Sequence, residues 1–473
     1  MNRVLQLFLV TALGALIAPA LAGAAPRMHV GFHDDVNFRY EERRAEMLDQ
    51  ARDANTTIVR TLVTWSIVAP TRPANASNPF DKAYRFNDLD ELVRNTQERD
   101  MEVLITIWGT PKWANGGKTP NFLPARMSDL TAFSRAVASR YSGRFPGFPF
   151  VRFYSVWNES NLQLFLAPQF DAKGKSVGPR NYAKLAAAAY AGIKAGNSRA
   201  KVAVGSTSSN GRDKPLKGKS DTHSPGRFAQ LVAAANPRLK FDAWAQHPYP
   251  VPVSQKPSQL VRYPNVTLKS FPRFEKDLDK WFKRKNVRLW ITEYGHEVKS
   301  DGEPNGVSRA QQAAYAAQAL ALAKADPRTD MFIWFVFRDH ATSTWQSGLR
   351  TKSGAAKPSL ARFRTAARSA DARNAIVTAR GGIVSPTVTV ALRAYAAGTK
   401  PGELVGFNVV ILEQGKLVAG AQPTAAFGRD ATAAVRLVGF RPVKGRKYTV
   451  AITANVFSGG GVMLKRTLTL TAT

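Results

Sequence analysis

The chain has 473 residues, of which 44% are hydrophobic and 21% charged, a balance that excludes a largely disordered protein and suits one large domain with a smaller one. It contains no cysteine, which excludes a disulfide framework and thiol chemistry. The formal net charge of +33 is spread along the chain without a long basic run, so we expect no nucleic-acid partner. Such a charge would attract anionic glycans, although a compositional bias towards Ala and Arg is the simpler explanation of the charge.

The first residues predict an export signal. Arg3 provides a short basic start, residues 4–17 are mostly apolar, and residues 20–22 (Ala-Leu-Ala) have the small-x-small pattern of a cleavage site. The apolar stretch is shorter than the roughly 20 residues that a membrane-spanning helix needs. We therefore predict a signal peptide over residues 1–24, a protein that is secreted or held at the cell wall, and no transmembrane segment.

From residue 28 onward the chain repeats one theme, a short β-rich run followed by a helical pattern. The eight β-rich runs are Met28–Asp35, Thr57–Trp65, Met101–Trp108, Val151–Glu159, Lys201–Ser206, Phe241–Tyr249, Arg288–Gly295 and Met331–Asp339. The helical stretches are Tyr40–Ala54, Asn87–Arg99, Ser128–Tyr141, Asn181–Gly196, Pro225–Ala235, Ser270–Lys283, Ser308–Ala325 and Pro358–Arg368. This alternation predicts an α/β fold, a (β/α)8 TIM barrel over residues 25–375. A doubly wound open sheet is the alternative, but its glycine-rich phosphate loop is missing after the first run.

The sequence pattern changes after about residue 375. Residues 376–473 show no helical period and offer six strand-like runs with turn signals between them. These runs are Thr387–Tyr395, Glu403–Leu412, Lys416–Ala421, Ala433–Phe440, Lys447–Phe457 and Val462–Thr471. They predict a small C-terminal all-β sandwich of the Ig-like kind, an accessory domain. A stabilising or spacing role is the simplest one, and carbohydrate binding is the alternative.

Two β-rich runs of the predicted barrel end in a glutamate. Glu159 lies in residues 154–161 (Tyr-Ser-Val-Trp-Asn-Glu-Ser-Asn), and Glu293 lies in residues 289–295 (Leu-Trp-Ile-Thr-Glu-Tyr-Gly). The carboxyl ends of the strands form the rim where barrel enzymes place their sites, so glutamates after the fourth and seventh runs would face each other. A lone glutamate there is more simply a solvated rim residue. Two of them favour the carboxyl pair that glycoside hydrolysis with retention needs, about 5 to 5.5 Å apart.

These segments resemble the glycoside hydrolases of clan A. Residues 157–159 (Trp-Asn-Glu) and 292–295 (Thr-Glu-Tyr-Gly), with this strand placement, are most similar to families 39 and 5, and the resemblance covers the barrel but not the tail. It implies that Glu159 is the general acid/base and Glu293 the nucleophile. It also implies that Asn158 hydrogen-bonds the 2-hydroxyl of the sugar in the −1 subsite.

The resemblance extends to further positions around the predicted pair. Arg60, on the second run, matches an arginine beside the nucleophile, where a guanidinium would lower the pKa of the carboxyl. His247 and Tyr249 end the sixth run, where the clan has a histidine near the acid/base and a tyrosine that bonds the nucleophile, although a structural cluster is the alternative. We expect Trp334 to form the aromatic floor of the −1 subsite, unless a shift of register buries it behind the barrel. Trp108, at the end of the third run, is a further candidate for stacking on a sugar.

Taken together, the sequence predicts a secreted retaining glycoside hydrolase that cleaves O-glycosidic bonds of a polysaccharide or oligosaccharide by double displacement, a role in polysaccharide degradation. Two alternatives remain, a transglycosylase with the same carboxyl pair and a non-catalytic cell-wall or glycan-binding protein on the same barrel. The six histidines are scattered, so we expect no metal and no other cofactor.

Overall fold

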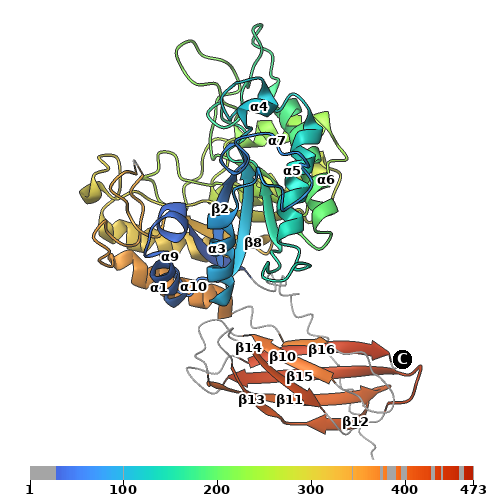
Figure 1. Ribbon diagram of the computed structural model, residues 1–473. Helices are drawn as coiled ribbons and strands as arrows, with labels where there is room; N and C mark the ends of the chain where they lie inside the picture. The colour runs from blue at the N-terminus through green and yellow to red at the C-terminus, as the bar shows by residue number, and fades with distance from the viewer. Residues whose placement is uncertain are drawn as a thin grey trace, which may run out of the picture.

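The computed structural model describes residues 28–99, 101–343, 345–372, 377–380, 390–395, 402–427, 432–437, 440, 442–456 and 463–471. Figure 1 shows a barrel ringed by helices and, coloured orange to red, the antiparallel strands of the C-terminal part. The predicted signal peptide and the predicted boundary near residue 375 lie outside the described residues and stay predictions. No helix among the described residues is long and apolar enough to cross a membrane.

Eight parallel strands form a closed barrel. They are β1 (His29–His33), β2 (Ile58–Thr64), β3 (Glu102–Trp108), β4 (Phe153–Val156), β5 (Lys201–Thr207), β6 (Ala243–Gln246), β7 (Arg288–Ile291) and β8 (Thr329–Phe335). Neighbours along the chain pair in order, and β1 closes the circle by pairing with β8. The predicted barrel is confirmed. Several strands end earlier than expected, so the glutamates follow β4 and β7 instead of closing them.

Helices follow the strands and cover the outside of the barrel. The long ones are α1 (Arg44–Asp53), α3 (Asn87–Glu98), α5 (Met127–Arg140), α6 (Gly178–Gly196), α7 (Pro225–Ala235), α8 (Phe271–Trp281), α9 (Arg309–Ala325) and α10 (Pro358–Ala372). Shorter turns of helix, which the sequence pattern did not indicate, are η1 (Val36–Tyr40), α2 (Trp65–Val68), α4 (Lys112–Asn115), η2 (Leu268–Ser270) and η3 (Lys299–Asp301). The start of α9 has a local cause: Ser308 and Gln311 cap each other's backbone N–H in a capping box.

The interior of the barrel is layered. Its apolar floor is formed by alternate strand residues: Ile58, Leu104, Phe153, Ala203, Ala243, Ala245, Trp290, Met331 and Ile333. The next inward-facing residues on β2, β3 and β4 are polar, Arg60, Thr106 and Ser155, and all three are fully buried. Because side chains alternate along a strand, this polar layer lies one step nearer the carboxyl ends than the floor. The barrel therefore carries a buried cation directly beneath its mouth.

The C-terminal part consists of two antiparallel sheets. One contains β14 (Thr432–Leu437), β10 (Val390–Tyr395) and β9 (Val377–Arg380). The other contains β12 (Lys416–Ala421), β11 (Leu404–Glu413), β15 (Lys447–Val456) and β16 (Met463–Thr471), with β13 (Thr424–Ala426) also on β11. The predicted all-β fold is confirmed, and β9 and β13 are two short strands that the pattern missed.

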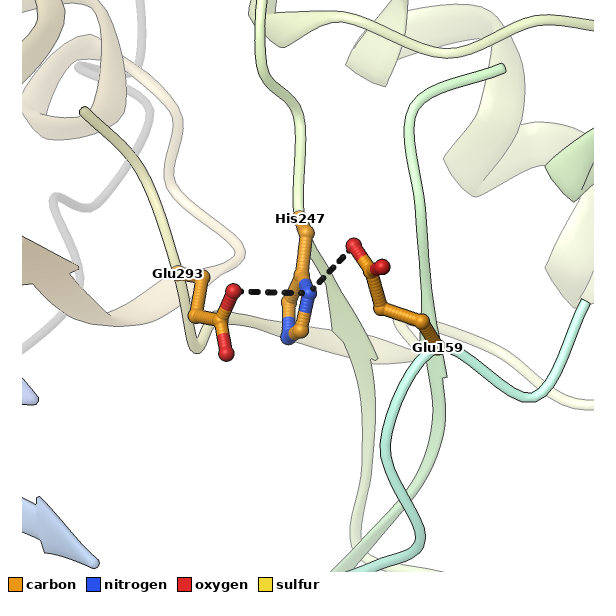
Figure 2. A group of neighbouring side chains, drawn as sticks. All are labelled: Glu159, His247 and Glu293. Carbon is orange, nitrogen blue, oxygen red and sulfur yellow. Dashed lines mark hydrogen bonds and ion pairs between the residues drawn. The ribbon is translucent and has the colours of Figure 1, made fainter. Parts of the chain in front are cut away.

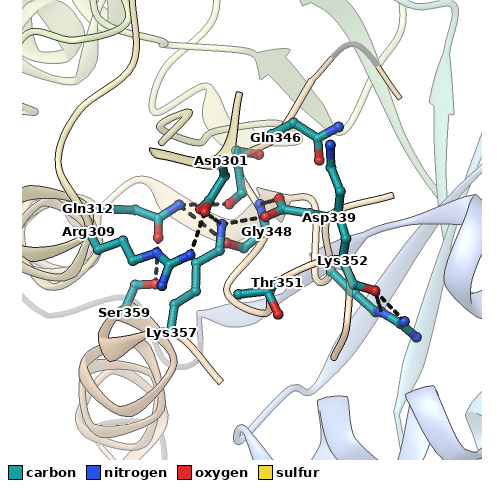
Figure 3. A network of polar contacts seen from close by, with 12 residues as sticks. Asp301, Arg309, Gln312, Asp339, Gln346, Gly348, Thr351, Lys352, Lys357 and Ser359 are labelled. Carbon is teal, nitrogen blue, oxygen red and sulfur yellow. Dashed lines mark hydrogen bonds and ion pairs between the residues drawn. The ribbon is translucent and has the colours of Figure 1, made fainter. Parts of the chain in front are cut away.

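A buried ion cluster fixes the loops that follow β7 and β8 (Figure 3). The ammonium of Lys357, just before α10, lies 2.7 Å from a carboxylate oxygen of Asp301 and 2.5 Å from one of Asp339. Asp339 also accepts a hydrogen bond of 2.7 Å from the backbone N–H of Gly348. The cluster thus ties together both loops and the start of α10, and the loop between β8 and α10 carries Trp345 to the mouth of the barrel.

We expect Lys357→Met to destabilise the barrel by about 3–5 kcal/mol, because it leaves the buried carboxylate of Asp339 without its cation, whereas Asp301 keeps its ion pair with Arg309. Urea unfolding followed by tryptophan fluorescence measures the change. The matched control is Arg43→Ala, which breaks an exposed pair with Glu46 and should cost less than about 1 kcal/mol. Equal losses in the two variants would contradict a structural role for the cluster.

Candidate active site

The two glutamates lie close together at the carboxyl ends of the strands. Glu159 is three residues beyond β4 and Glu293 two residues beyond β7. Oxygens of both carboxylates and a ring nitrogen of His247 lie within 4.8 Å of one another. The backbone that delivers Glu159 is strained, with φ of 71° at Trp157 and 35° at Glu159. Such angles persist where surrounding contacts over-determine them, which is common at functional sites.

The fully buried Arg60 connects the elements of the site. Its Nη1 donates to Oε1 of Glu293 at 2.5 Å and to the carbonyl of Thr292 at 3.1 Å. Its Nη2 donates to Oδ1 of Asn158 at 2.7 Å, and its Nε donates to the hydroxyl of Thr106 at 3.0 Å. Since a guanidinium can only donate, the oxygen of Asn158 faces Arg60 and the amide NH2 is left for another acceptor. One side chain thus fixes the loops after β4 and β7.

The surroundings of Glu293 favour its charged form. Burial alone would raise the pKa of this carboxyl, but positive charge on His247, Arg60 and His33, with a contact to His33, outweighs burial and holds the pKa well below its ordinary value. The ring Nδ1 of His33 lies 3.5 Å from Oε1 of Glu293. Glu293 therefore stays ionised over the whole physiological range.

His247 lies between the two carboxylates (Figure 2). Its Nδ1 is 3.1 Å from Oε1 of Glu159 and 3.4 Å from Oε2 of Glu293. Its Nε2 is buried and has no hydrogen-bond partner among the described residues, whereas Nδ1 faces two carboxylate acceptors and therefore carries a hydrogen. The hydroxyl of Tyr249 donates to Oε2 of Glu293 at 3.3 Å. The structure thus brings Arg60, His247 and Tyr249 to the carboxyl pair where the sequence placed them.

A cavity of about 660 Å³ opens over this group. His33, Asn158, Glu159, Tyr249 and Glu293 line it together with the aromatic side chains of Phe165, Phe335 and Trp345. Its outer wall is formed by Leu164, Ser208–Asn210 and Pro250–Val253, from the loops after β4, β5 and β6. No lysine or arginine is among the lining residues. The cavity thus has an ionisable floor, aromatic sides and an otherwise uncharged wall.

The expectation that Trp334 forms the floor of the sugar site is wrong. Trp334 is fully buried and lies in the core between barrel and helices, where its ring is 6.2 Å from that of Phe363 on α10. Met331 and Ile333 are the inward-facing residues of β8, so the next inward position belongs to Phe335, which lines the cavity. Trp108 is half-buried between Trp157 and Phe165 and is not a lining residue.

Sequence reasoning missed two contributors to the site. His33, the last residue of β1, touches Glu293 and lies 3.6 Å from Asp35, and nothing local to β1 marked it as a partner of the β7 glutamate. Phe335 lies two residues beyond the inward-facing Ile333, but the unbroken apolar run from Phe332 to Phe337 hides which residues of β8 face inward. The sequence pattern could not place Trp345 at the cavity either, because its position depends on a loop tied down by the Lys357 cluster.

The geometry of the site argues against two other roles for its carboxylates. Glu159, His247 and Glu293 are the one group among the described residues that could hold a metal ion, but Arg60 already neutralises Glu293, so the residues fit a cation poorly. Burial also raises the pKa of Glu297 to about 7, a value suited to an acid catalyst. Glu297 does not line the cavity, so position rules it out.

A closed (β/α)8 barrel with facing glutamates after β4 and β7 is the arrangement of clan A glycoside hydrolases. The chain belongs to glycosyl hydrolase family 5, since the family model described as Cellulase (glycosyl hydrolase family 5) matches residues 32–336. It is a glycoside hydrolase. No curated protein sequence matches the chain.

Solved structures of related enzymes have a similar fold. A family 39 glycoside hydrolase from Bacteroides cellulosilyticus WH2 has a TM-score of 0.55 and 16% identity, over 88% of this chain and 81% of that one. A glucosidase from Croceicoccus marinus has a TM-score of 0.53 and 12% identity, over 88% and 95% of the two chains. A GH5_18 protein from Streptomyces cattleya, in complex with GlcNAc, has a TM-score of 0.53 and 15% identity, over 76% and 84%. At these identities the likeness establishes the fold alone.

The low pKa of Glu293 predicts how stability depends on pH. Below the ordinary value of 4.5 the unfolded chain takes up a proton at this position while the folded protein does not. Wild type should therefore lose about 1.4 kcal/mol per pH unit relative to Glu293→Gln as the pH falls below 4.5. Urea unfolding at pH 3.5 to 7 measures both proteins. Parallel stability curves would show that Glu293 is not held ionised.

Proposed function

We propose that this protein is a secreted, retaining glycoside hydrolase that cleaves O-glycosidic bonds of a polysaccharide or oligosaccharide, with Glu159 as acid/base and Glu293 as nucleophile. The observation that carries the proposal is the spacing of the carboxylates. Oxygens of the two groups lie within 4.8 Å. Retaining enzymes hold their carboxyls about 5–5.5 Å apart, whereas inverting enzymes leave about 6.5–9.5 Å for a water. Export is supported by the sequence pattern of residues 1–24.

The contacts of Glu293 indicate which oxygen attacks. Oε1 accepts the short hydrogen bond from Arg60, whereas Oε2 has only the longer contacts to Tyr249 and His247. Oε2 is therefore the oxygen free to form the bond to the anomeric carbon. As that bond forms, Glu159 gives its proton to the leaving oxygen, and the glycosidic bond breaks.

The second step reverses the roles around the same carbon. Glu159, now ionised, accepts a proton from water, and the resulting hydroxide attacks the anomeric carbon and releases Glu293 as a carboxylate. Arg60 receives the returning charge without moving, which is the advantage of a preorganised donor. The amide NH2 of Asn158 lies at the cavity beside Glu159 and is placed to donate to the 2-hydroxyl of the sugar.

The nucleophile can be identified by trapping it. Incubation with a panel of activated 2-deoxy-2-fluoro glycosides should give a protein whose mass rises by one sugar, with the adduct mapped to Glu293 by peptide sequencing. Glu293→Gln is the matched control and should remain unlabelled, since an amide does not attack. An adduct on a different carboxylate would overturn the assignment.

The acid/base role makes a separate prediction. Glu159→Ala should lower kcat/KM by about 10²–10⁴-fold for glycosides with poor leaving groups, and far less for 2,4-dinitrophenyl glycosides, whose leaving group needs no proton. Added azide should restore turnover and give a glycosyl azide. Glu297→Ala removes a neighbouring buried carboxyl outside the cavity and should show no such dependence on the leaving group. Equal losses on both substrates would refute the role of Glu159.

A further inference from the structure

Six exposed cations gather on the loops that form the outer wall of the cavity. We call them the basic rim: Lys173 and Lys175 after β4, and Arg212, Lys214, Lys217 and Lys219 after β5. None of the six forms an ion pair with any residue that the structure describes. Elsewhere on the barrel many arginines are paired, as Arg39 is with Asp88 and Arg140 with Asp90. The guanidinium of Arg212 donates a hydrogen bond of 2.5 Å to the carbonyl of Ser220, and the five lysines are exposed cations available to an external anion.

The two loops form one surface with the cavity. A bridge joins Leu162 to Thr222, and Gly174, between the first two rim lysines, lies beside Pro215, which follows Lys214. Asn210 lines the cavity two residues before Arg212. The third wall, after β6, attaches through a 2.8 Å hydrogen bond from the N–H of Val266 to the carbonyl of Ser209. The rim is therefore a continuation of the cavity wall.

Charge is distributed unevenly around the mouth of the barrel. Besides Glu159, the loops after β4 and β5 hold only the acids Asp171, Asp213 and Asp221, and residues 247–267 after β6 hold none. The loops after β7 and β1 have the opposite excess. Their acids are Glu293, Glu297, Asp301, Glu303, Asp34, Asp35, Glu41 and Glu42, against the cations Lys299, Arg39 and Arg43. The loop after β8, between those two, carries Arg338, Arg350, Lys352 and Lys357 against Asp339. The contrast is therefore between the side of β4 to β6, which favours negative charge, and the loops after β7 and β1.

We propose that the basic rim binds an anionic polysaccharide, one that bears carboxylate or sulfate groups, and guides it into the cavity; this rests on the proposed hydrolase function. The cavity lining holds no lysine or arginine that would select an anionic sugar at the cleavage site itself. A volume of about 660 Å³ is that of a small-ligand site, so a polymer must continue beyond it. Its next units meet the rim, where their anionic groups find cations. We favour a polysaccharide over a nucleic acid as the ligand of the basic rim, because the rim continues the wall of a cavity that holds the two glutamates of a glycoside hydrolase.

The test compares two triple charge reversals in the full chain. The rim variant carries Lys214→Glu, Lys217→Glu and Lys219→Glu. The control variant carries Lys276→Glu, Lys280→Glu and Lys285→Glu, at exposed positions on and after α8 that form no ion pair among the described residues. Both variants have the same net charge, so a difference between them reports on the position of the charge. Thermal melting of both shows that they are folded.

Affinity electrophoresis in gels with alginate, dextran sulfate or neutral dextran measures binding. We expect alginate or dextran sulfate, but not dextran, to retard wild type and the control variant. The rim variant should bind at least about ten-fold more weakly, and the gap should close at high salt. Equal binding by the two variants would overturn the proposal, as would tighter rim-dependent binding of single-stranded DNA. Rim-dependent binding by a protein that no fluoroglycoside labels would refute the hydrolase function and leave the binding surface standing.

Discussion

A single buried cation organises the mouth of this barrel. Arg60 is fully enclosed, and removing a guanidinium from water costs several kcal/mol unless its donors are met. They are met by Glu293, Asn158, Thr106 and the carbonyl of Thr292, which belong to three different segments of the chain. Because leaving any donor unpaired is costly, the loops after β4 and β7 are held in one arrangement. Catalytic geometry here follows from the need to satisfy Arg60.

That arrangement explains why strain is tolerated beside the acid/base. Trp157 and Glu159 adopt positive φ, yet the indole of Trp157 is fully buried and donates to the carbonyl of Phe165 at 2.6 Å. With Asn158 bonded to Arg60 between them, the turn has contacts on both sides. The strain places the Glu159 carboxyl over the cavity instead of along the strand. The unfavourable backbone conformation at Trp157 and Glu159 thus holds the carboxyl of Glu159 at a fixed distance from that of Glu293.

The parts of the site that the sequence revealed are those carried by strand ends. Glu159, Glu293, Arg60, His247 and Tyr249 each lie on or just after a β-rich run, so their position around the rim follows from counting strands. The prediction for Trp334 was wrong because every residue from Phe332 to Phe337 is apolar, as in strands buried on both faces. Such a run does not show which residues face the inside of the barrel. His33 and Trp345 could not be placed, because their contacts depend on barrel closure and on the ion cluster around Lys357.

Positive charge acts both in the interior and at the surface of this protein, and solvent screens it to a different extent in the two places. In the interior, where the effective dielectric constant is low, the guanidinium of Arg60, 2.5 Å from Glu293, together with His247 and His33 holds that carboxyl ionised. At the surface a single lysine is screened within about 10 Å and achieves little alone, so six unpaired cations on joined loops are needed for a comparable influence on a ligand. The uncharged cavity wall between these two regions keeps them apart. Cations that met the substrate inside the cavity would also act on the glutamates and disturb the difference in charge between them on which double displacement depends.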